Sequence, residues 1–155
     1  MFSRRDWLRL SASGAATVIL ARRLPALTPP EEKITVYKSP TCGCCHNRVE
    51  YMNRNGFTVT AHALPDDKLT EKKDTFGIPA TLRSCHVALT GPYVFEGHIP
   101  VDLVRKVLKE KPKLAGLTVP GMPVGSPGME MGGRKDKYDV VAFDKSGKTW
   151  VYVSR

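Results

Sequence analysis

The sequence predicts a single α/β domain in which strands and helices follow the order β-α-β-α-β-β-α, with a loop and a closing β-hairpin after them. Short segments with alternating polar and apolar residues, rich in β-branched side chains, are separated by segments with helical periodicity. The chain has 155 residues, of which 41% are hydrophobic and 25% are charged. These values are typical of one soluble globular domain and exclude a multidomain enzyme.

The first predicted strand and helix lie between residues 33 and 55. Residues 33–38 alternate polar and apolar side chains, and Ser39-Pro40 stops the strand. Thr41 can cap the helix that follows, and Asn55-Gly56 ends it. A cluster of cysteines, starting at Cys42, therefore lies at a helix N-terminus, where amide donors and the helix dipole favour a thiolate.

A second strand and helix and then a hairpin come next. Residues 57–63 alternate again and predict a strand, and residues 66–76 predict a polar, weakly amphipathic helix. Residues 87–90 and 93–96 flank the turn residues Gly91-Pro92, which indicates a β-hairpin.

The last helix is followed by a C-terminal extension. Residues 101–111 carry an apolar face that ends before Pro112, so they predict a helix. Residues 117–133 contain too many Gly and Pro residues for a regular element and predict a loop, which carries three methionines, Met122, Met129 and Met131. Residues 138–153 predict a closing hairpin with Ser146-Gly147 in its turn.

This element order, with cysteines at the start of the first helix, resembles the thioredoxin superfamily over residues 33–111. In that fold a cis-proline loop before the third strand faces the C-x-x-C motif. Pro79 would occupy this position only if ten residues, 80–89, formed one strand, whereas strands usually have about 5 to 6 residues. Counting back from the hairpin turn instead places Cys85 and His86 there. We therefore expect the fourth cysteine of the chain to face the first three.

Residues 1–30 predict a signal segment that precedes the domain at residues 31–155. The segment Ser3-Arg4-Arg5-Asp6-Trp7-Leu8-Arg9 is followed by an uncharged run of 12 residues, 10–21, and this pattern resembles a twin-arginine signal. A helix that spans a bilayer needs about 20 apolar residues. We therefore expect export to the periplasm without a stable membrane anchor.

The basic charge does not indicate a nucleic-acid partner. The formal net charge is +9, and residues 1–30, with five Arg and one Asp, account for 4 of these charges. In the rest of the chain, Lys and Arg are interleaved with acidic residues, whereas a groove that follows phosphates needs basic residues clustered with aromatic ones. We expect no nucleic-acid binding.

The cysteine pattern supports more than one chemistry. Cys42 and Cys45 form a C-x-x-C pair, which is typical of a thiol-disulfide oxidoreductase in which the first cysteine attacks and the second resolves the mixed disulfide. Cys44 adds a third thiol that offers competing disulfides, a pattern better suited to a soft metal ion. Two purely structural disulfides are disfavoured, because a bond within four residues staples little of the chain.

Metal binding at these cysteines leaves two candidate ions. Zinc remains open, since four thiolates, or three with His86, would satisfy it. Copper(I) is favoured because thiolates and thioethers are soft ligands, and the loop supplies thioethers. His86, His98, Met122 and Met129 are candidate additional ligands or outer partners of the metal site.

Four segments in order resemble the CopG-type copper-resistance proteins, a family of thioredoxin-like proteins of bacterial periplasms. They are Cys42-Gly43-Cys44-Cys45-His46, Arg83-Ser84-Cys85-His86, Gly97-His98-Ile99-Pro100 and residues 119–130. The resemblance runs from about Ile34 to the C-terminus. It implies copper binding through the C-x-C-C thiolates and the later cysteine, here Cys42, Cys44, Cys45 and Cys85, in the sequestration, delivery or redox handling of copper.

The sequence hypothesis is therefore a periplasmic copper-binding protein that holds copper(I) at a multi-cysteine site and contributes to copper resistance or handling. Other periplasmic copper-handling proteins are candidate partners. The alternative is a thiol-disulfide oxidoreductase that uses Cys42 and Cys45, and a weaker alternative is a zinc-binding module. We also expect the loop at 117–133 to be mobile without metal and to close over the thiols when copper binds.

Overall fold

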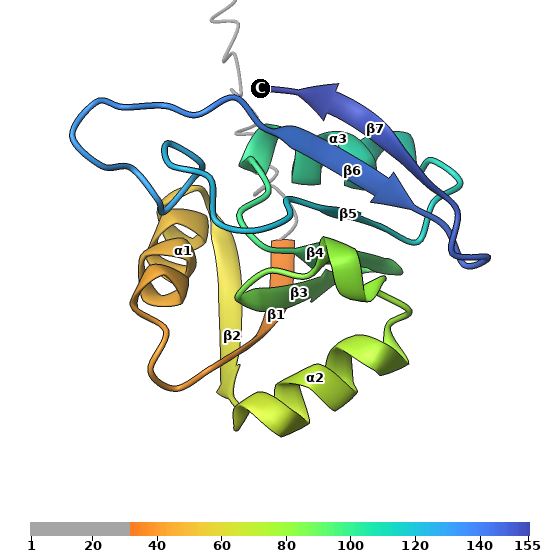
Figure 1. The fold of residues 1–155 in the computed structure, drawn as a ribbon, viewed down its shortest axis with the longest axis horizontal. Coiled ribbons are helices and arrows are strands. Elements are labelled where there is room, and N and C mark those ends of the chain that lie inside the picture. The colour runs from red at the N-terminus through yellow and green to blue at the C-terminus, as the bar shows by residue number, and fades with distance from the viewer. Residues whose placement is uncertain (1–31) are drawn as a thin grey trace, which may run out of the picture.

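The structure, a computed structural model, describes residues 32–155 as one seven-stranded sheet with helices on both faces (Figure 1). The elements in chain order are β1 (Glu32–Lys38), α1 (Gly43–Arg54), β2 (Phe57–Ala63), α2 (Asp66–Thr75), a 3-10 turn (Ala80–Leu82), β3 (His86–Thr90), β4 (Tyr93–Glu96), α3 (Val101–Glu110), β5 (Gly116–Thr118), β6 (Asp139–Phe143) and β7 (Thr149–Ser154). The predicted α/β, thioredoxin-like order is confirmed, with the closing hairpin after it. The signal segment expected at 1–30 lies outside the described residues.

The sheet has the strand order β2-β1-β3-β4-β5-β6-β7. β1 lies parallel to β2 and antiparallel to β3, and β3 and β4 form the predicted hairpin. β5 pairs in parallel with β4, and β6 and β7 add to β5 as an antiparallel hairpin. The C-terminal extension therefore continues the main sheet.

β5 corrects the prediction that a loop begins at residue 117. Leu117 and Thr118 pair with Phe95 and Glu96 of β4 and are fully buried. A strand of three residues is too short to show an alternating pattern, and its pairing partner lies far away in the sequence. The loop proper therefore starts after Thr118 and runs to β6.

The sheet separates two apolar layers, because successive side chains of a strand point to opposite faces. On one face, α1 and α3 bury Met52, Val104 and Val107 against strand residues such as Ile34 and Phe95. On the other face, α2 contributes Leu69 to a smaller cluster that includes Val87, Val94 and Phe143. Burial of each such side chain contributes about 1.5–3 kcal/mol, and it fixes the strand ends that carry the site.

The helix ends differ slightly from those predicted. Cys42, not Thr41, is the N-cap residue of α1, and its side chain makes no capping hydrogen bond. The Thr41 hydroxyl instead lies 3.4 Å from the Ser39 hydroxyl. α2 and α3 each end one residue earlier than predicted, and α3 ends because Lys111 adopts a left-handed conformation, with φ of 50°.

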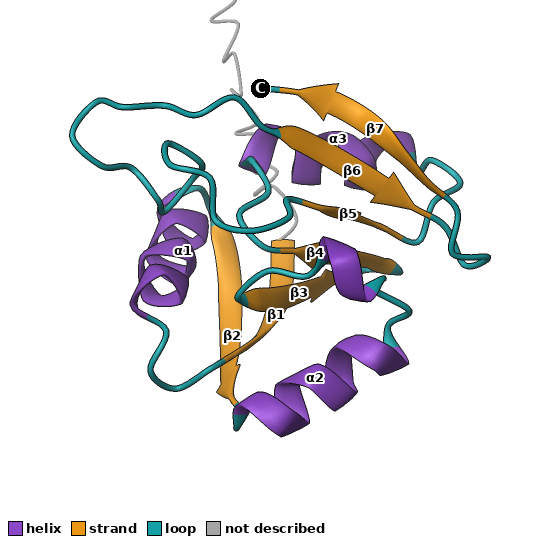
Figure 2. Ribbon diagram, in the orientation of Figure 1, coloured by secondary structure: helices purple, strands orange, loops and turns teal. Residues whose placement is uncertain are grey.

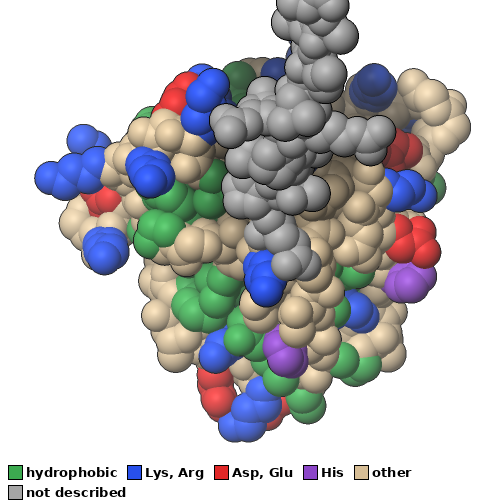
Figure 3. Space-filling view, turned by 180° about the vertical axis from the view of Figure 1, so that it is seen from behind, with side chains coloured by type: hydrophobic (Ala, Val, Ile, Leu, Met, Phe, Trp, Pro, Cys, Tyr) green, Lys and Arg blue, Asp and Glu red, His purple; other side chains and the backbone are tan. Residues whose placement is uncertain are grey.

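No helix within residues 32–155 is long and apolar enough to cross a bilayer. On the visible part of the face drawn in Figure 3, Lys and Arg side chains are dispersed, several of them beside Asp or Glu. The long connection between β5 and β6 passes beside α1 (Figure 2), and its residues Met122 and Gly128 lie next to Cys44 and Arg48 of that helix.

Candidate metal centre

The first three cysteines lie at the N-terminus of α1. Cys42 and Cys45 are joined as a disulfide, and Cys44 is a free thiol between them. Cys45 is fully buried, whereas Cys42 and Cys44 are partly exposed. The sulfur atom of Cys44 lies 3.3 Å from that of Cys42. The helix start therefore presents two accessible sulfur atoms and holds the third inside the protein.

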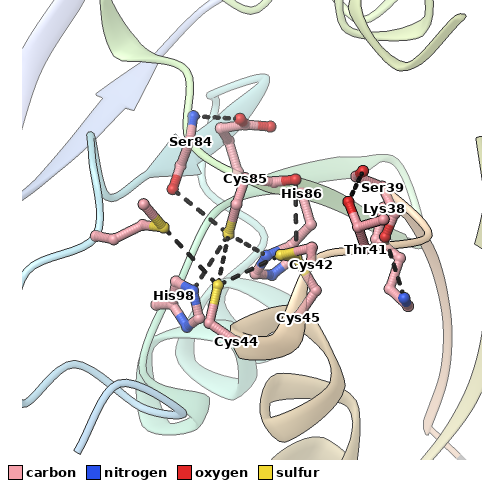
Figure 4. Close-up of a disulfide and its surroundings, with 12 residues drawn as sticks. Lys38, Ser39, Thr41, Cys42, Cys44, Cys45, Ser84, Cys85, His86 and His98 are labelled. Atoms are coloured by element: carbon pink, nitrogen blue, oxygen red, sulfur yellow. Dashed lines mark hydrogen bonds between the residues drawn. A yellow bond between two sulfur atoms is a disulfide. The ribbon is translucent and has the colours of Figure 1, made fainter. Parts of the chain in front are cut away.

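Cys85, the residue just before β3, brings its sulfur atom to the same cluster. Its Sγ atom lies 3.6 Å from the Cys44 Sγ atom, and the ligand atoms of all four cysteines lie within 4.8 Å of one another (Figure 4). The expectation that Cys85 faces the C-x-x-C motif is therefore met by the geometry. Pro79 precedes the 3-10 turn and not a strand, and no peptide bond in residues 32–155 is cis.

Two histidines extend the cluster behind Cys85. The Cys85 Sγ atom lies 3.2 Å from His86 Nδ1 and 3.3 Å from His98 Nε2, and both rings are almost completely buried. His98 Nδ1 lies 2.8 Å from the carbonyl oxygen of Pro127. Because a carbonyl only accepts hydrogen bonds, we assign the proton to Nδ1, which leaves the Nε2 lone pair directed at the Cys85 sulfur.

The electrostatics of this pocket favour neutral side chains before a metal arrives. Burial holds the pKa of His86 well below its ordinary value, and the neighbouring His98 and the cations Arg48 and Lys73 lower it further. Burial also lowers the pKa of His98. Burial, together with the nearby Cys44, raises the pKa of Cys85 to about 12. Neutral imidazoles are ready to act as ligands, while a metal ion must displace the Cys85 proton.

Of the loop methionines, Met122 lies against the cysteines. Its Sδ atom is 3.8 Å from the Cys44 Sγ atom, and its side chain is 52% exposed. The backbone of Met129 stabilises a turn of the loop: its N–H donates to the Ser126 carbonyl, and its carbonyl accepts from the Gly125 N–H. Met131 is 62% exposed and lies in an isolated bridge with Arg134. The structure thus brings one predicted thioether to the thiols, and a ligand role for Met129 stays a prediction.

The loop that carries Met122 has protein contacts of its own. The Ser84 hydroxyl donates to the carbonyl of Gly121, and His98 donates to Pro127. Gly128, with φ of +89°, lies so close to α1 that a Cβ atom at this position would be 3.1 Å from the backbone nitrogen of Arg48. The loop is therefore attached next to the cysteines on both sides of residue 122. The predicted effect of copper on its mobility stays a prediction.

Two buried charge sites near the cysteines are absent from the sequence predictions. Arg48 is 4% exposed, donates to the carbonyl of Ile99, and has its pKa lowered by burial to about 10. The Lys73 ammonium, from α2, lies 2.6 Å from Glu96 Oε1 and 2.5 Å from the Ser84 carbonyl oxygen. The Ser84 N–H donates to the same Glu96 oxygen at 2.6 Å. The buried pair therefore holds both backbone groups of the residue before Cys85.

The other two histidines of the described chain belong to neither group of potential metal ligands. His46 is exposed and lies 3.2 Å from Glu50 one turn further along α1. His62 stacks on Tyr37 with ring centroids 5.3 Å apart.

The residues gathered here fit a soft metal ion. Four cysteine sulfur atoms, two of them joined in the disulfide, converge with one thioether and two neutral imidazoles. Thiolates and thioethers prefer copper(I) over hard cations. Fold and site together define a thioredoxin-like protein with a multi-cysteine cluster that could bind a metal.

Comparison with known proteins places the chain in a family. Two solved structures of the copper resistance protein CopG, Form 1 and Form 2, match with a TM-score of 0.75 each and with 40% and 39% identity. Each match covers 81% of this chain and 98% of the CopG chain. Residues 82–129 also match the family described as "Protein of unknown function, DUF411". The chain belongs to the CopG family. No relative is found among curated proteins.

Proposed function

We propose that this chain is a periplasmic copper-binding protein that holds copper(I) on the thiolates of Cys42, Cys44, Cys45 and Cys85 and contributes to copper resistance or handling. The observation that carries the proposal is the convergence of these four sulfur atoms, with ligand atoms within 4.8 Å. The relatives named for copper resistance support the choice of metal. Other periplasmic copper-handling proteins are the candidate partners for delivery.

Each ligand group has a separate physical role in this proposal. The helix N-terminus stabilises the thiolates of Cys42 and Cys44, because its free N–H groups and dipole favour negative charge. Cys85 adds a thiolate from the far side and lies between two neutral imidazoles. Met122 adds an exposed thioether at the rim, where an incoming ion can first be bound.

Copper titration of cysteine variants tests the proposal. Cys44→Ser and Cys85→Ser should each lower copper(I) stoichiometry or affinity substantially, because a hydroxyl cannot replace a thiolate toward a soft cation. His62→Asn serves as a control, since His62 stacks on Tyr37 and belongs to neither group of potential metal ligands. Elemental analysis of protein purified without oxygen would identify the metal, and a zinc-loaded chain would favour the zinc alternative. Copper titrations of both serine variants that match the unaltered chain would contradict the proposal.

The disulfide supports a second candidate function, that of a thiol-disulfide oxidoreductase. Cys42 is partly exposed and Cys45 is buried, as expected of an attacking and a resolving thiol. This activity needs only Cys42 and Cys45. Disulfide exchange that survives in Cys44→Ser and Cys85→Ser, together with unchanged copper binding, would favour it over the metal site.

The periplasmic location rests on the leader and has its own test. Arg4→Lys combined with Arg5→Lys should retain the folded precursor in the cytoplasm, because lysine lacks the planar guanidinium fork on which recognition of a twin-arginine signal depends. Cell fractionation gives the readout. Normal appearance of the shortened chain in the periplasm would show that the leader is of another type.

A further inference from the structure

The four cysteines divide into two pairs in the structure. The disulfide takes up the sulfur atoms of Cys42 and Cys45, so neither can act as a thiolate ligand. Cys44 and Cys85 remain free thiols and lie 3.6 Å apart. The closed disulfide therefore leaves a second pair of sulfur atoms available to a metal.

The free pair belongs to a continuous set of soft donors. The Cys44 sulfur lies 3.8 Å from the Met122 sulfur, and the Cys85 sulfur lies 3.3 Å from the His98 Nε2 atom, whose lone pair is directed at it. In a tetrahedral site with metal–sulfur bonds of about 2.3 Å, neighbouring sulfur atoms are about 3.8 Å apart. The Cys44 sulfur already lies at about this spacing from both the Cys85 sulfur, at 3.6 Å, and the Met122 sulfur, at 3.8 Å.

We propose that the oxidised chain, with Cys42 joined to Cys45, still binds one copper(I) ion at Cys44, Cys85, Met122 and His98, and that reduction of the disulfide adds further copper capacity. The inference rests on the proposed function and adds its regulation. The redox state of one cysteine pair then sets how much copper the protein holds, while the other pair keeps its ion.

Cys42 and Cys44 are approached from different sides, although Cys85 lies between them. A cleft of about 350 Å³ is lined by Cys42 and Cys85 and by the polar residues Ser39, Thr70 and Arg83, among others, but not by Cys44. The sulfur of Cys44 instead contacts the exposed Met122 of the loop. A thiol or disulfide reagent can thus reach Cys42 through the cleft, while copper exchanges at the side of Met122.

The chemical step that closes the pair needs a disulfide compound as oxidant. The Cys42 thiolate attacks this compound, RSSR, because Cys45 is fully buried, and a Cys42–SR mixed disulfide forms with release of one RS⁻. The Cys45 thiolate then attacks the Cys42 sulfur and releases the second RS⁻. In the metal-free chain, the two protons of the dithiol end on the two RSH products. In the copper-loaded chain the two thiolates carry no protons, so the products are two RS⁻ and the copper(I) ion, which is released without a change in its oxidation state.

Copper(I) titration of the reduced and the oxidised chain tests the inference. One sample of the full chain is reduced and another is treated with glutathione disulfide. Small thiols and disulfides are then removed under anaerobic conditions. Both samples are titrated with copper(I) in competition with the chelator bicinchoninate. We expect one equivalent in the oxidised chain and more than one in the reduced chain. Alkylation of free thiols followed by peptide mass analysis should find Cys42 joined to Cys45, with Cys44 and Cys85 alkylated.

Variants separate the two pairs. Cys42→Ser combined with Cys45→Ser should bind one equivalent before and after glutathione disulfide. Loss of an outer partner of a metal ligand lowers metal affinity about 10–100-fold. Met122→Leu removes a direct ligand, so it should lower the copper(I) affinity of the oxidised chain at least about tenfold. Met131→Leu is the matched control, because Met131 is another exposed methionine of the same loop, without a contact to the cysteines among those described.

The outcomes distinguish this inference from the function on which it rests. An oxidised chain that binds no copper(I), while the reduced chain binds it, would overturn the inference and leave the proposed function standing. Equal stoichiometries in both states, or a disulfide mapped to Cys44 and Cys85, would also overturn it. A reduced chain that binds no copper(I) would overturn both.

Discussion

Lys73→Met tests whether the buried ion pair positions Cys85. The side chains of Lys73 and Glu96 are 5% and 0% exposed, and removal of one partner from a buried pair costs about 3–5 kcal/mol. The Ser84 carbonyl loses its donor as well, while Glu96 keeps the Ser84 N–H. Burial already raises the pKa of Glu96, so protonation of this group should hold the loss near the lower end of that range.

The assay is urea unfolding of the metal-free chain at pH 7, followed by a copper(I) titration. Lys68→Met is the matched control, because Lys68 lies on the same helix and pairs with Glu71 on the surface, where removal should change little. Lys73→Met combined with Glu96→Gln should cost less than Lys73→Met alone, since no charge is then left buried. Equal unfolding midpoints for the Lys73 and Lys68 variants, with unchanged copper affinity, would refute the positioning role.

The free energy of unfolding of Lys73→Met should depend on pH in a direction that a loss of packing alone would not produce. Without the ammonium, the folded pKa of Glu96 lies further above its unfolded value, so the folded chain binds the extra proton. Stability of the variant relative to the unaltered chain should therefore recover as the pH falls toward the ordinary pKa of a glutamate, about 4.3. A difference between the two chains that stays constant with pH would contradict this account.

Three other predictions concern the loop and the histidines. Burial lowers the pKa of His98 in the folded chain, so the free energy of unfolding has its full value above about pH 6.5 and falls as His98 must be protonated at lower pH. In the metal-free chain, His98→Asn should therefore reduce the slope of the free energy of unfolding against pH below this value by up to about 1.4 kcal/mol per pH unit. Parallel curves for the two chains would argue against this role. Gly128→Ala should weaken copper(I) binding and destabilise the chain more than Gly132→Ala, since both have positive φ but only Gly128 lies against Arg48; equal unfolding midpoints would show that the contact is unimportant. Hydrogen exchange over residues 117–133 should slow when copper is added, and Leu at all three methionines should weaken retention against a chelator; unchanged exchange and retention would make the loop purely structural.

The order of elements and the position of Cys85 opposite the C-x-x-C motif could be predicted from the sequence, because both depend on local patterns. Alternation and turn residues locate the strands, and the hairpin turn at Gly91-Pro92 fixes by counting where Cys85 must lie. The same local reasoning placed the closing hairpin correctly around Ser146-Gly147. Here the information lies within a few residues of the feature that it predicts.

The remaining features depend on partners that are distant in the sequence. Lys73 lies on a polar helix and has the pattern of a solvated side chain, yet it is buried because Glu96 and Ser84 meet it from other elements. Likewise, no local signal distinguishes Met122 from Met129. The contact of Gly121 with Ser84 brings Met122 to the cysteines, and that contact requires the finished sheet.

The route by which the C-terminal extension joins the sheet sets an order in time for the metal centre. β1 and β3 are neighbours, so Cys42 and Cys85 can meet as soon as the first four strands have formed. Met122 follows β5, which needs β4 as its template, and the loop is closed only after β6 has paired with β5. Contacts between distant segments form slowly. We therefore expect the thiols to be assembled before the thioether arrives, so that a folding chain exposes an unfinished, more open cluster until residues 119–155 have folded.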